Sequence, residues 1–585
     1  MPHTRTADEN VPLERSEPAP AHQADQAHQA VQAHQADPAH QADQSDQVDP
    51  AGPAGPARQV DPSGPPTPRY RRTALLPWAW AAALCLLYAT VAVRRHLLMR
   101  TTGYDLGIFE QAVRAYAEFR APVVPLRGED FNLLGDHFHP LLAVLAPLYR
   151  LFPSPLTLLV VQSALLALAA VPLVRWAVRA VGPRGAHAVA AGYGLSWGVA
   201  SAAAFDFHEV ALAVPLLAFS LEALGRQRWP AAVAWAAPLL LVKEDLGLTL
   251  AAVGAYIALK GRTDGRARKL GLATVAAGIA GSLLEIKVLL PALGPTGGYA
   301  HGGQLAAAHG SLLSALAHGP LDLLRPDIKA TTLILVFAPS ALLALRSPLA
   351  LVALPTLGWR MASENGFHWG TAFHYSAVLM PVVFAGLLDV LGRETGREAV
   401  GVTGRVTGGV TGCDTGGVTG RVTGGARDRE TAHRNVRAAL ATVLAVTAVL
   451  IPSFPLAQLA QRATWRTTPH LEAARALLAR IPDGATVAAS NRLAPQLTSR
   501  CTVVLFPTFP VDGRLYEYRR EDLPRPTAEW IVHDPQTPEA WPYKEGHWPY
   551  PLEQQRTELA AARQKYGYEV VAVRDGITLL RRTTR

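Results

Sequence analysis

Long apolar runs separated by short polar segments make up most of this chain between residues 74 and 456. The runs are Ala74–Val93, Pro155–Val178, Ala186–Ala204, Glu209–Leu224, Trp229–Val242, Leu246–Leu259, Leu270–Leu290, Ala330–Leu345, Ser347–Met361, Thr371–Leu391 and Val436–Leu456. A helix that crosses a bilayer without tilt needs about 20 apolar residues, so the shorter runs imply tilted helices or a locally thinned bilayer. The pattern predicts a mainly α fold, a polytopic transmembrane helix bundle with about 11 crossings.

The composition is that of a membrane protein. Of the 585 residues, 49% are hydrophobic and only 17% are charged, and the mean hydropathy is +0.13. Soluble domains have about 25% charged residues, which argues against a set of soluble domains. The formal net charge of +9 fits basic loops beside anionic lipids, so we expect the lipid bilayer and not nucleic acid as the partner.

Two segments lack the apolar residues that a folded core needs. Residues 1–68, rich in His, Gln, Ala, Asp and Pro, repeat the motif AHQAD and are expected to form a disordered tail. Its histidines have no fixed neighbours to orient them, so we expect a linker rather than a metal site. Residues 392–435 carry the Val-Thr-Gly repeats of a low-complexity loop, to which the sequence assigns no function.

The positive charges between the runs predict the orientation of residues 69–456 in the cell membrane. If Arg72 is cytoplasmic, later loops with basic residues such as Arg179 and Arg226 also fall inside, as the positive-inside rule requires. The N-terminus and the Val-Thr-Gly loop are then cytoplasmic, and the chain after Leu456 is extracytoplasmic. The exception is a basic group after the first run, Arg94, Arg95 and Arg100, which falls outside.

The outer loop at about residues 101–152 is expected to form surface helices. The apolar segment His139–Phe152 is too short to cross and is interpreted as an interfacial or re-entrant helix. The segment GYDLGIFEQAVRAYA keeps its apolar residues at helical spacing, which predicts an amphipathic helix on the bilayer surface. Asp105 lies at its first turn and is either a helix cap or a catalytic or binding carboxylate.

Residues 457–585 are more polar and predict a small extracytoplasmic α/β domain. The segments TVAAS, CTVVLFP and AEWIVHD have the pattern of strands, and EVVAVRDGITLLRR has that of a hairpin turning at Asp575-Gly576. HLEAARALLARI and PLEQQRTELAAARQKYG have the pattern of helices. The domain has no Gly-rich phosphate loop and no nucleophile elbow, so we interpret it as an accessory module.

Further polar residues interrupt the apolar runs on the predicted outer side, where charges are costly and therefore candidates for function. Besides Asp105, the candidate substrate-binding residues are Arg94, Arg95, Asp136, His137, His139, Asp206, His208, Glu209, Lys243, Glu244, Asp245, His374 and Tyr375, and Glu364 and His368 lie in the same cluster as the last two. Each cluster also has a plainer interpretation as a helix cap or a turn. The candidate ligands of a divalent cation are Asp136, His137, Asp206 and His208.

These motifs resemble those of a known family. GYDLGIFEQAVRAYA, FNLLGDHFHPLLAVLAPLYRLFPSPLTLLVVQSALLALAAVPL, FDFHE and KED look like the bacterial membrane proteins of domain of unknown function 2079. That family in turn resembles the GT-C glycosyltransferases, which include protein mannosyltransferases and lipid A aminoarabinose transferases. Asp105 matches the acid after the first helix of those enzymes, and His139-Pro140 matches the start of their later apolar segment. The adjacent acids often seen there are replaced by Asp105-Leu106.

The resemblance implies an inverting transfer of a sugar from a polyprenyl phosphate to a cell-envelope glycan or protein. Asp105 would take the proton from the acceptor hydroxyl. The phosphate leaving group would need positive charge from Arg94, Arg95, Lys243 or a bound divalent cation. Buried charges also mark the substrate paths of transporters, so a transporter or lipid-handling protein, or a non-catalytic assembly or sensor protein, is the alternative.

Overall fold

The computed structural model describes residues 68–294, 297, 325–363, 365–396, 426–507, 526–535 and 552–583. The chain divides into Met1–Pro65, which lies outside the described residues, and one compact unit, Pro66–Arg585. The expected tail and the Val-Thr-Gly repeats fall almost wholly outside the described residues, as does Glu364.

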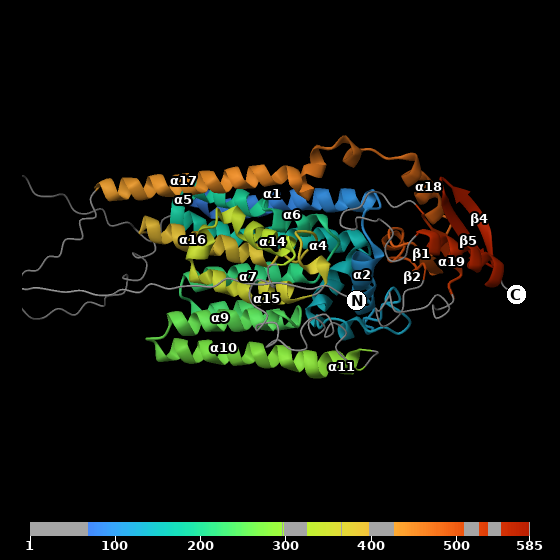
Figure 1. The fold of residues 1–585 in the computed structure, drawn as a ribbon, viewed down its shortest axis with the longest axis horizontal. Coiled ribbons are helices and arrows are strands. Elements are labelled where there is room, and N and C mark those ends of the chain that lie inside the picture. Colours follow the sequence, from blue (N-terminus) through green and yellow to red (C-terminus); the bar gives the residue numbers. More distant parts are fainter. Residues whose placement is uncertain are drawn as a thin grey trace, which may run out of the picture. The chain divides into compact units, whose positions relative to one another are not determined.

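Helices account for most of the compact unit (Figure 1). The longer helices are α1 (Pro68–Leu97), α4 (Pro155–Leu168), α5 (Ala170–Gly194), α6 (Trp197–Ala204), α7 (Val210–Gly225), α8 (Trp229–Ala236), α9 (Leu246–Lys260), α10 (Gly265–Leu284), α14 (Asp327–Phe337), α15 (Leu354–Ala362), α16 (Leu379–Thr395) and α17 (Ala426–Leu450). Each predicted apolar run overlaps at least one of these helices, which confirms a mainly helical fold.

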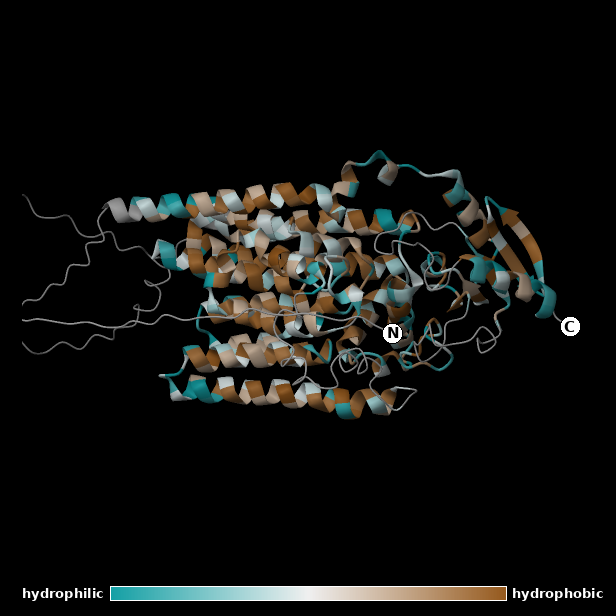
Figure 2. Cartoon of the chain, viewed as in Figure 1, coloured by the Kyte–Doolittle hydropathy of each residue, from teal (hydrophilic) through white to brown (hydrophobic). Residues whose placement is uncertain are grey.

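Four described stretches are long and apolar enough to cross a membrane: Thr73–Leu97, Pro155–Gly194, Gly265–Leu293 and Glu430–Ser453. Shorter apolar helices accompany them, and apolar residues extend along the outward sides of helices such as α10 and α17 (Figure 2). These helices support a membrane protein, whereas the number of about 11 crossings stays a prediction. Within the second stretch, Gly182 has φ 81° and divides α5 into two helical parts, at the break expected between Val178 and Ala186.

Helices α9 and α10 pack closely through glycines. A Cβ atom on Gly278 would lie 2.3 Å from the carbonyl oxygen of Gly247, and one on Gly254 would lie 2.7 Å from that of Gly271. Small residues at such spacing let two helix backbones approach, which is a common packing mode of membrane helices. The core of the bundle is formed around α16, most of whose residues are buried.

The C-terminal α/β segment (residues 457–585) contains the predicted helices and strands. Helices α18 (Pro469–Leu478) and α19 (Leu552–Lys565) accompany strands β1 (Thr486–Ala489), β2 (Thr502–Leu505), β3 (Trp530–His533), β4 (Tyr568–Arg574) and β5 (Ile577–Arg582). The sheet order is β2-β1-β3-β5-β4; β1 runs parallel to β2 and β3, and β5 is antiparallel to β3 and β4. The hairpin turns at Asp575-Gly576, both with positive φ, as the sequence predicted.

The outer loop after α1 folds into short helices. These are η1 (Gly103–Gly107), α2 (Ile108–Ala117), η2 (Leu133–Gly135), η3 (Pro140–Leu145) and α3 (Ala146–Leu151). Helix α2 differs from the expected surface helix because even Glu110 and Gln111 on its polar side are buried. Thr498 and Val503 of the C-terminal α/β segment, with Tyr149 and Leu126 of the outer loop, are their polar partners, so this face does not meet open water.

Candidate functional site

The turn that carries Asp105 is held from two sides. Asp206, between α6 and α7, accepts hydrogen bonds through Oδ2 from the backbone N (2.8 Å) and Oγ1 (2.6 Å) of Thr102. Asn491, just after β1, accepts one from the N of Gly103 through its backbone oxygen (2.6 Å) and one from the N of Tyr104 through Oδ1 (3.0 Å). The amides at the start of η1 have no intrahelical partner, and these contacts satisfy three of them.

The side chain of Asp105 makes no hydrogen bond or ion pair with any residue in the described parts of the chain, whereas its backbone oxygen accepts from the N–H of Ile108. It does not cap α2, whose N-cap position is Gly107 with no side-chain bond. Burial raises the pKa of Asp105 well above its usual value, and the negative charges of Asp206 and Glu209 raise it further, against Lys243. The carboxyl group is therefore held in place by its backbone while its oxygens stay available.

A buried ion pair lies close to Asp105. Lys243 Nζ is 3.0 Å from Glu209 Oε1, and the Glu209 side chain is fully buried. Oε2 of Glu209 is 2.6 Å from Nδ1 of His208. The sequence places these residues in two separate turns, before α7 and before α9, and the fold brings the turns together. Such a pair within an apolar bundle is costly unless its members are mutually compensated.

Three histidines surround this pair. The rings of His208 and His374 stack with centroids 3.3 Å apart, and Phe109 lies between His208 and His139, at 5.1 and 5.8 Å from their rings. Among the described residues, Nδ1 of His139 and both ring nitrogens of His374 are buried without a hydrogen-bond partner. Buried polar atoms in proteins are nearly always paired, so these nitrogens offer hydrogen bonds to a polar ligand.

A second group lies beside the first, around the outer loop. Arg127 Nη2 forms an ion pair with Asp136 Oδ1 at 3.0 Å, and its Nη1 donates to the hydroxyl of Tyr104 at 2.7 Å. His137 Nδ1 is 2.7 Å from Glu244 Oε1. These contacts connect the outer loop both to η1 and to the turn before α9.

The other candidates have diverse surroundings. Asp245 directly precedes α9 without capping it; its Oδ1 has no partner among the described residues, and burial raises its pKa to about 6. The Tyr375 ring lies under the guanidinium of Arg360, at 5.7 Å, and is close enough to Asp105 and Lys243 for their charges to act on it.

The two basic candidates at the end of α1 differ in their contacts. Arg94 donates through Nε and Nη2 to the carbonyl oxygen of Thr464, at 3.0 and 2.7 Å, and covers the ring of Trp465. Arg95 donates to Gln458 Oε1 and to the carbonyl oxygen of Arg100, both at 3.3 Å, and its charge also interacts with Asp206. Of the two guanidinium groups, that of Arg95 is therefore the one directed toward the Asp105 turn.

The four candidate cation ligands have separate partners: Arg127 for Asp136, Glu244 for His137, Thr102 for Asp206 and Glu209 for His208. Within the described ranges, no group of three or more His, Cys, Asp or Glu side chains is arranged to hold a metal ion. These residues therefore do not fit a divalent cation.

Sequence reasoning missed Asn491, Arg492 and Arg127. Asn491 and Arg492 follow β1, a strand parallel to both of its neighbours, and ligands often bind at the carboxyl ends of parallel strands. That position was the signal available in the sequence. Arg127 had no such signal, because its role depends on the folded loop.

Comparison with known proteins identifies the family of this chain. The family model described as predicted membrane protein (DUF2079) matches residues 95–579. No curated protein matches the sequence. Among solved structures, the crystal structure of ArnT from Cupriavidus metallidurans bound to undecaprenyl phosphate is similar, with 14% sequence identity and a TM-score of 0.45 over 86% of this chain and 97% of that chain.

Proposed function

Because the chain belongs to the family of predicted membrane proteins DUF2079, we propose a specific membrane activity for it. The protein is a glycosyltransferase that moves a sugar from a polyprenyl-phosphate donor to a cell-envelope acceptor, a glycan or a protein, on the outer face of the membrane. The observation that carries this proposal is Asp105: a carboxyl group with a raised pKa, fixed by its backbone and without a side-chain partner in the described chain.

In the proposed reaction Asp105 is the general base. As the acceptor oxygen attacks the anomeric carbon, Asp105 takes the hydroxyl proton, the new carbon–oxygen bond forms, and the bond to the phosphate oxygen breaks. The phosphate leaves with the bonding electron pair. A carboxyl pKa raised above its usual value makes the carboxylate a stronger base for this step, because its affinity for the proton is higher.

The surrounding residues are proposed to bind the donor. His139, His374 and Tyr375 present hydrogen-bonding groups for sugar hydroxyls. The Glu209–Lys243 pair and His208, which stacks on His374, hold the histidines in position. Of the remaining candidates, Asp136, His137, Asp206 and Glu244 hold the outer loop and the Asp105 turn through the contacts described above, and Asp245 follows Glu244 directly. Arg95 and, more distantly, Arg94 supply positive charge for the phosphate.

A cell-based experiment tests this function. Cells that lack the chain are supplied with the native protein or with Asp105→Asn, at equal membrane abundance, and their envelope glycans and polyprenyl lipids are compared by mass spectrometry. We expect the variant to lack a glycosylated acceptor and to accumulate the sugar-bearing lipid. Unchanged acceptor glycosylation in cells that carry Asp105→Asn would refute the proposal.

A further inference from the structure

Three arginines gather where the C-terminal α/β segment meets the end of α1. We infer that Arg95, Arg100 and Arg492 form a binding site for a phosphate-class anion, with Arg492 contributed by the C-terminal α/β segment. The inference rests on the proposed function only in naming a polyprenyl phosphate as one source of that anion; a free phosphate is the other. It gives the C-terminal α/β segment a direct role in binding, in place of the accessory role expected from the sequence.

The position of Arg492 follows from its neighbours. Asn491 is bound to Gly103 and Tyr104 through two backbone amides, so the next residue must lie at the start of the Asp105 turn. The backbone at Gly103 lies very close to Ala494 of the C-terminal α/β segment: a Cβ atom on Gly103 would lie 2.7 Å from the Cβ of Ala494. Only glycine fits there without displacement of the C-terminal α/β segment.

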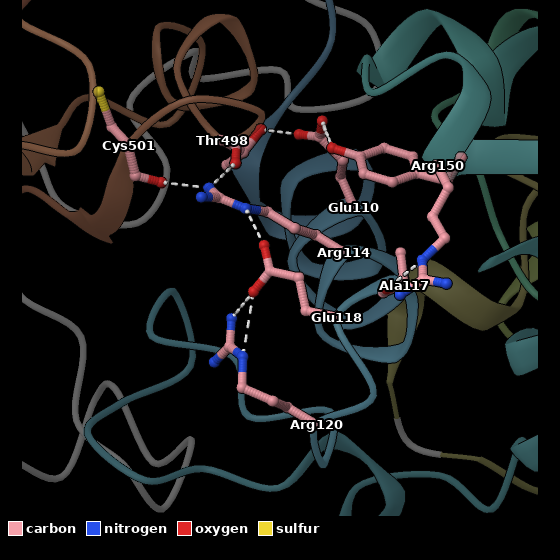
Figure 3. Close-up of polar contacts among 9 residues, drawn as sticks. Glu110, Arg114, Ala117, Glu118, Arg120, Arg150, Thr498 and Cys501 are labelled. Carbon is pink, nitrogen blue, oxygen red and sulfur yellow. Dashed lines mark hydrogen bonds and ion pairs between the residues drawn. The ribbon is translucent and has the colours of Figure 1, made fainter. Parts of the chain in front are cut away.

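Helix α2 fixes the same segment from a second direction (Figure 3). Arg114 Nη1 donates to the carbonyl oxygens of Thr498 and Cys501, both at 3.1 Å. Thr498 Oγ1 donates to the buried carboxyl of Glu110. Gln111 Nε2 donates to the carbonyl oxygen of Val503 at 2.8 Å.

The end of α1 provides a third anchor. Arg475 donates to the carbonyl oxygen of Leu97 at 2.7 Å, and Gln496 donates to that of His96 at 3.2 Å. With contacts to α1, η1 and α2, the C-terminal α/β segment holds Arg492 in a defined place beside Arg95 and Arg100.

The charges at this place do not balance. The positive charges of Arg95, Arg100 and Arg492 act on one another, and Asp206 is the carboxylate that acts on both Arg95 and Arg492. Neither Arg100 nor Arg492 forms an ion pair within 4 Å in the described chain. Asp534, the other acid near Arg492, already forms an ion pair with His470 at 2.9 Å. Because arginine keeps its proton in proteins, the excess is positive.

A phosphate-class anion matches this excess in charge and geometry. The planar guanidinium presents two parallel N–H groups to two oxygens, and phosphate accepts such paired bonds from several arginines at once. The site adjoins the Asp105 turn through the Thr102–Asp206 contact, so a phosphate held here would lie beside the turn that carries that carboxyl.

Binding to the purified full chain tests the site without any need for activity. The chain is placed in phosphatidylcholine nanodiscs, which carry no net charge, and binding of a polyprenyl phosphate is compared with that of the matching polyprenol by native mass spectrometry. Inorganic phosphate is added as a competitor to distinguish the two sources. We expect phosphate-dependent binding that Arg492→Ala weakens by about 10- to 100-fold, the usual loss for hydrogen bonds to a charged group.

Matched variants separate the site from folding. Arg480→Ala removes an exposed arginine of the same segment and should leave binding unchanged; Arg492→Lys should restore part of it, and Arg100→Ala should weaken it as a second, independent test. If inorganic phosphate displaces the lipid, the site also binds free phosphate. If inorganic phosphate does not displace it, the site binds the phosphate only as part of the lipid. Equal affinity of native chain, Arg492→Ala and Arg100→Ala, or equal binding of polyprenol, would overturn the inference. The binding assay involves no sugar transfer, so failure of the transferase proposal would leave this result standing.

Discussion

His374 stacks on His208 with the ring centroids 3.3 Å apart, although the two residues belong to different turns of the helix bundle. Both nitrogens of the His374 ring are buried without a hydrogen-bond partner in the described chain. A fold that keeps such a ring bears the cost of desolvating it, which is typical of a residue retained for function rather than for stability.

Replacing His374 with Phe should therefore stabilise the protein while impairing donor binding. Phe keeps the ring and its stacking but removes the unpaired polar atoms, a change worth about 1–3 kcal/mol in favour of the folded state. Thermal unfolding in detergent measures the effect. His533→Phe is the matched control, because His533 Nε2 is hydrogen-bonded to Gln555 at 3.1 Å and its loss should lower the melting temperature. A similar decrease in both variants would show that His374 is structural.

The packing of α9 against α10 predicts a strong effect from a single methyl group. Gly278→Ala should destabilise the bundle by about 1–3 kcal/mol, because its Cβ would meet the backbone of Gly247. Gly358→Ala in α15 is the control, since nothing lies within 4 Å of a Cβ there, and it should be neutral or slightly stabilising. Melting temperatures of the two variants in detergent compare them directly; equal values would contradict the close packing.

The pH dependence of stability should reveal His470, which lies 2.9 Å from Asp534 and 2.8 Å from Asp575. Partial burial opposes protonation, but the hydrogen bonds and charges of the two acids raise the pKa of His470 above its usual value. Because folding favours protonated His470, this residue stabilises the folded state at pH values below its pKa in the unfolded chain. That stabilisation is lost as the pH rises through the pKa of His470 in the folded chain. The melting temperature of His470→Gln should fall below that of the native chain at pH 6 and approach it at pH 9. A difference that grows with pH would contradict this assignment.

The orientation of the chain in the membrane also awaits a measurement. We expect the C-terminal α/β segment outside and the Val-Thr-Gly loop inside. Glu569 is exposed on β4, so an impermeant maleimide should label Glu569→Cys in intact cells when Cys413 is replaced by Ser. Cys413 of the native chain should react only after lysis, while Cys501 is buried and Cys85 half-buried. Labelling of Cys413 in intact cells would contradict the proposed topology.

Local patterns predicted the elements well. The hairpin at Asp575-Gly576 was visible because the turn has its own residue signature, and each apolar run contains helices because apolar length is a local property. Contacts between distant segments were not visible. Nothing in the sequence pairs Glu209 with Lys243, because that ion pair depends on how the turns before α7 and before α9 come together in the fold.

The contact of the C-terminal α/β segment with the candidate site was not predicted from the sequence. Asn491 is an ordinary polar residue in a loop by sequence, and its importance arises from two backbone amides of the Asp105 turn that it satisfies. Helix α2 was misjudged for the same reason: its polar face has helical spacing, but the C-terminal α/β segment, not water, covers Gln111. Periodicity shows which face of a helix is polar and does not show what that face contacts.

The most direct test of the account is sugar transfer by the purified chain in proteoliposomes. Native protein, Asp105→Asn and Glu118→Gln are supplied with polyprenyl-phosphate-linked sugars and an envelope extract, and the initial rate of donor consumption is measured. Glu118→Gln makes the equivalent carboxylate-to-amide change on a partly exposed side chain that pairs with Arg114. We predict that Asp105→Asn lowers the rate by about 10²–10⁴-fold, as expected for loss of a general base, while Glu118→Gln does not. Equal rates for the native chain and Asp105→Asn, with donor consumed by both, would contradict the role of Asp105 as the base.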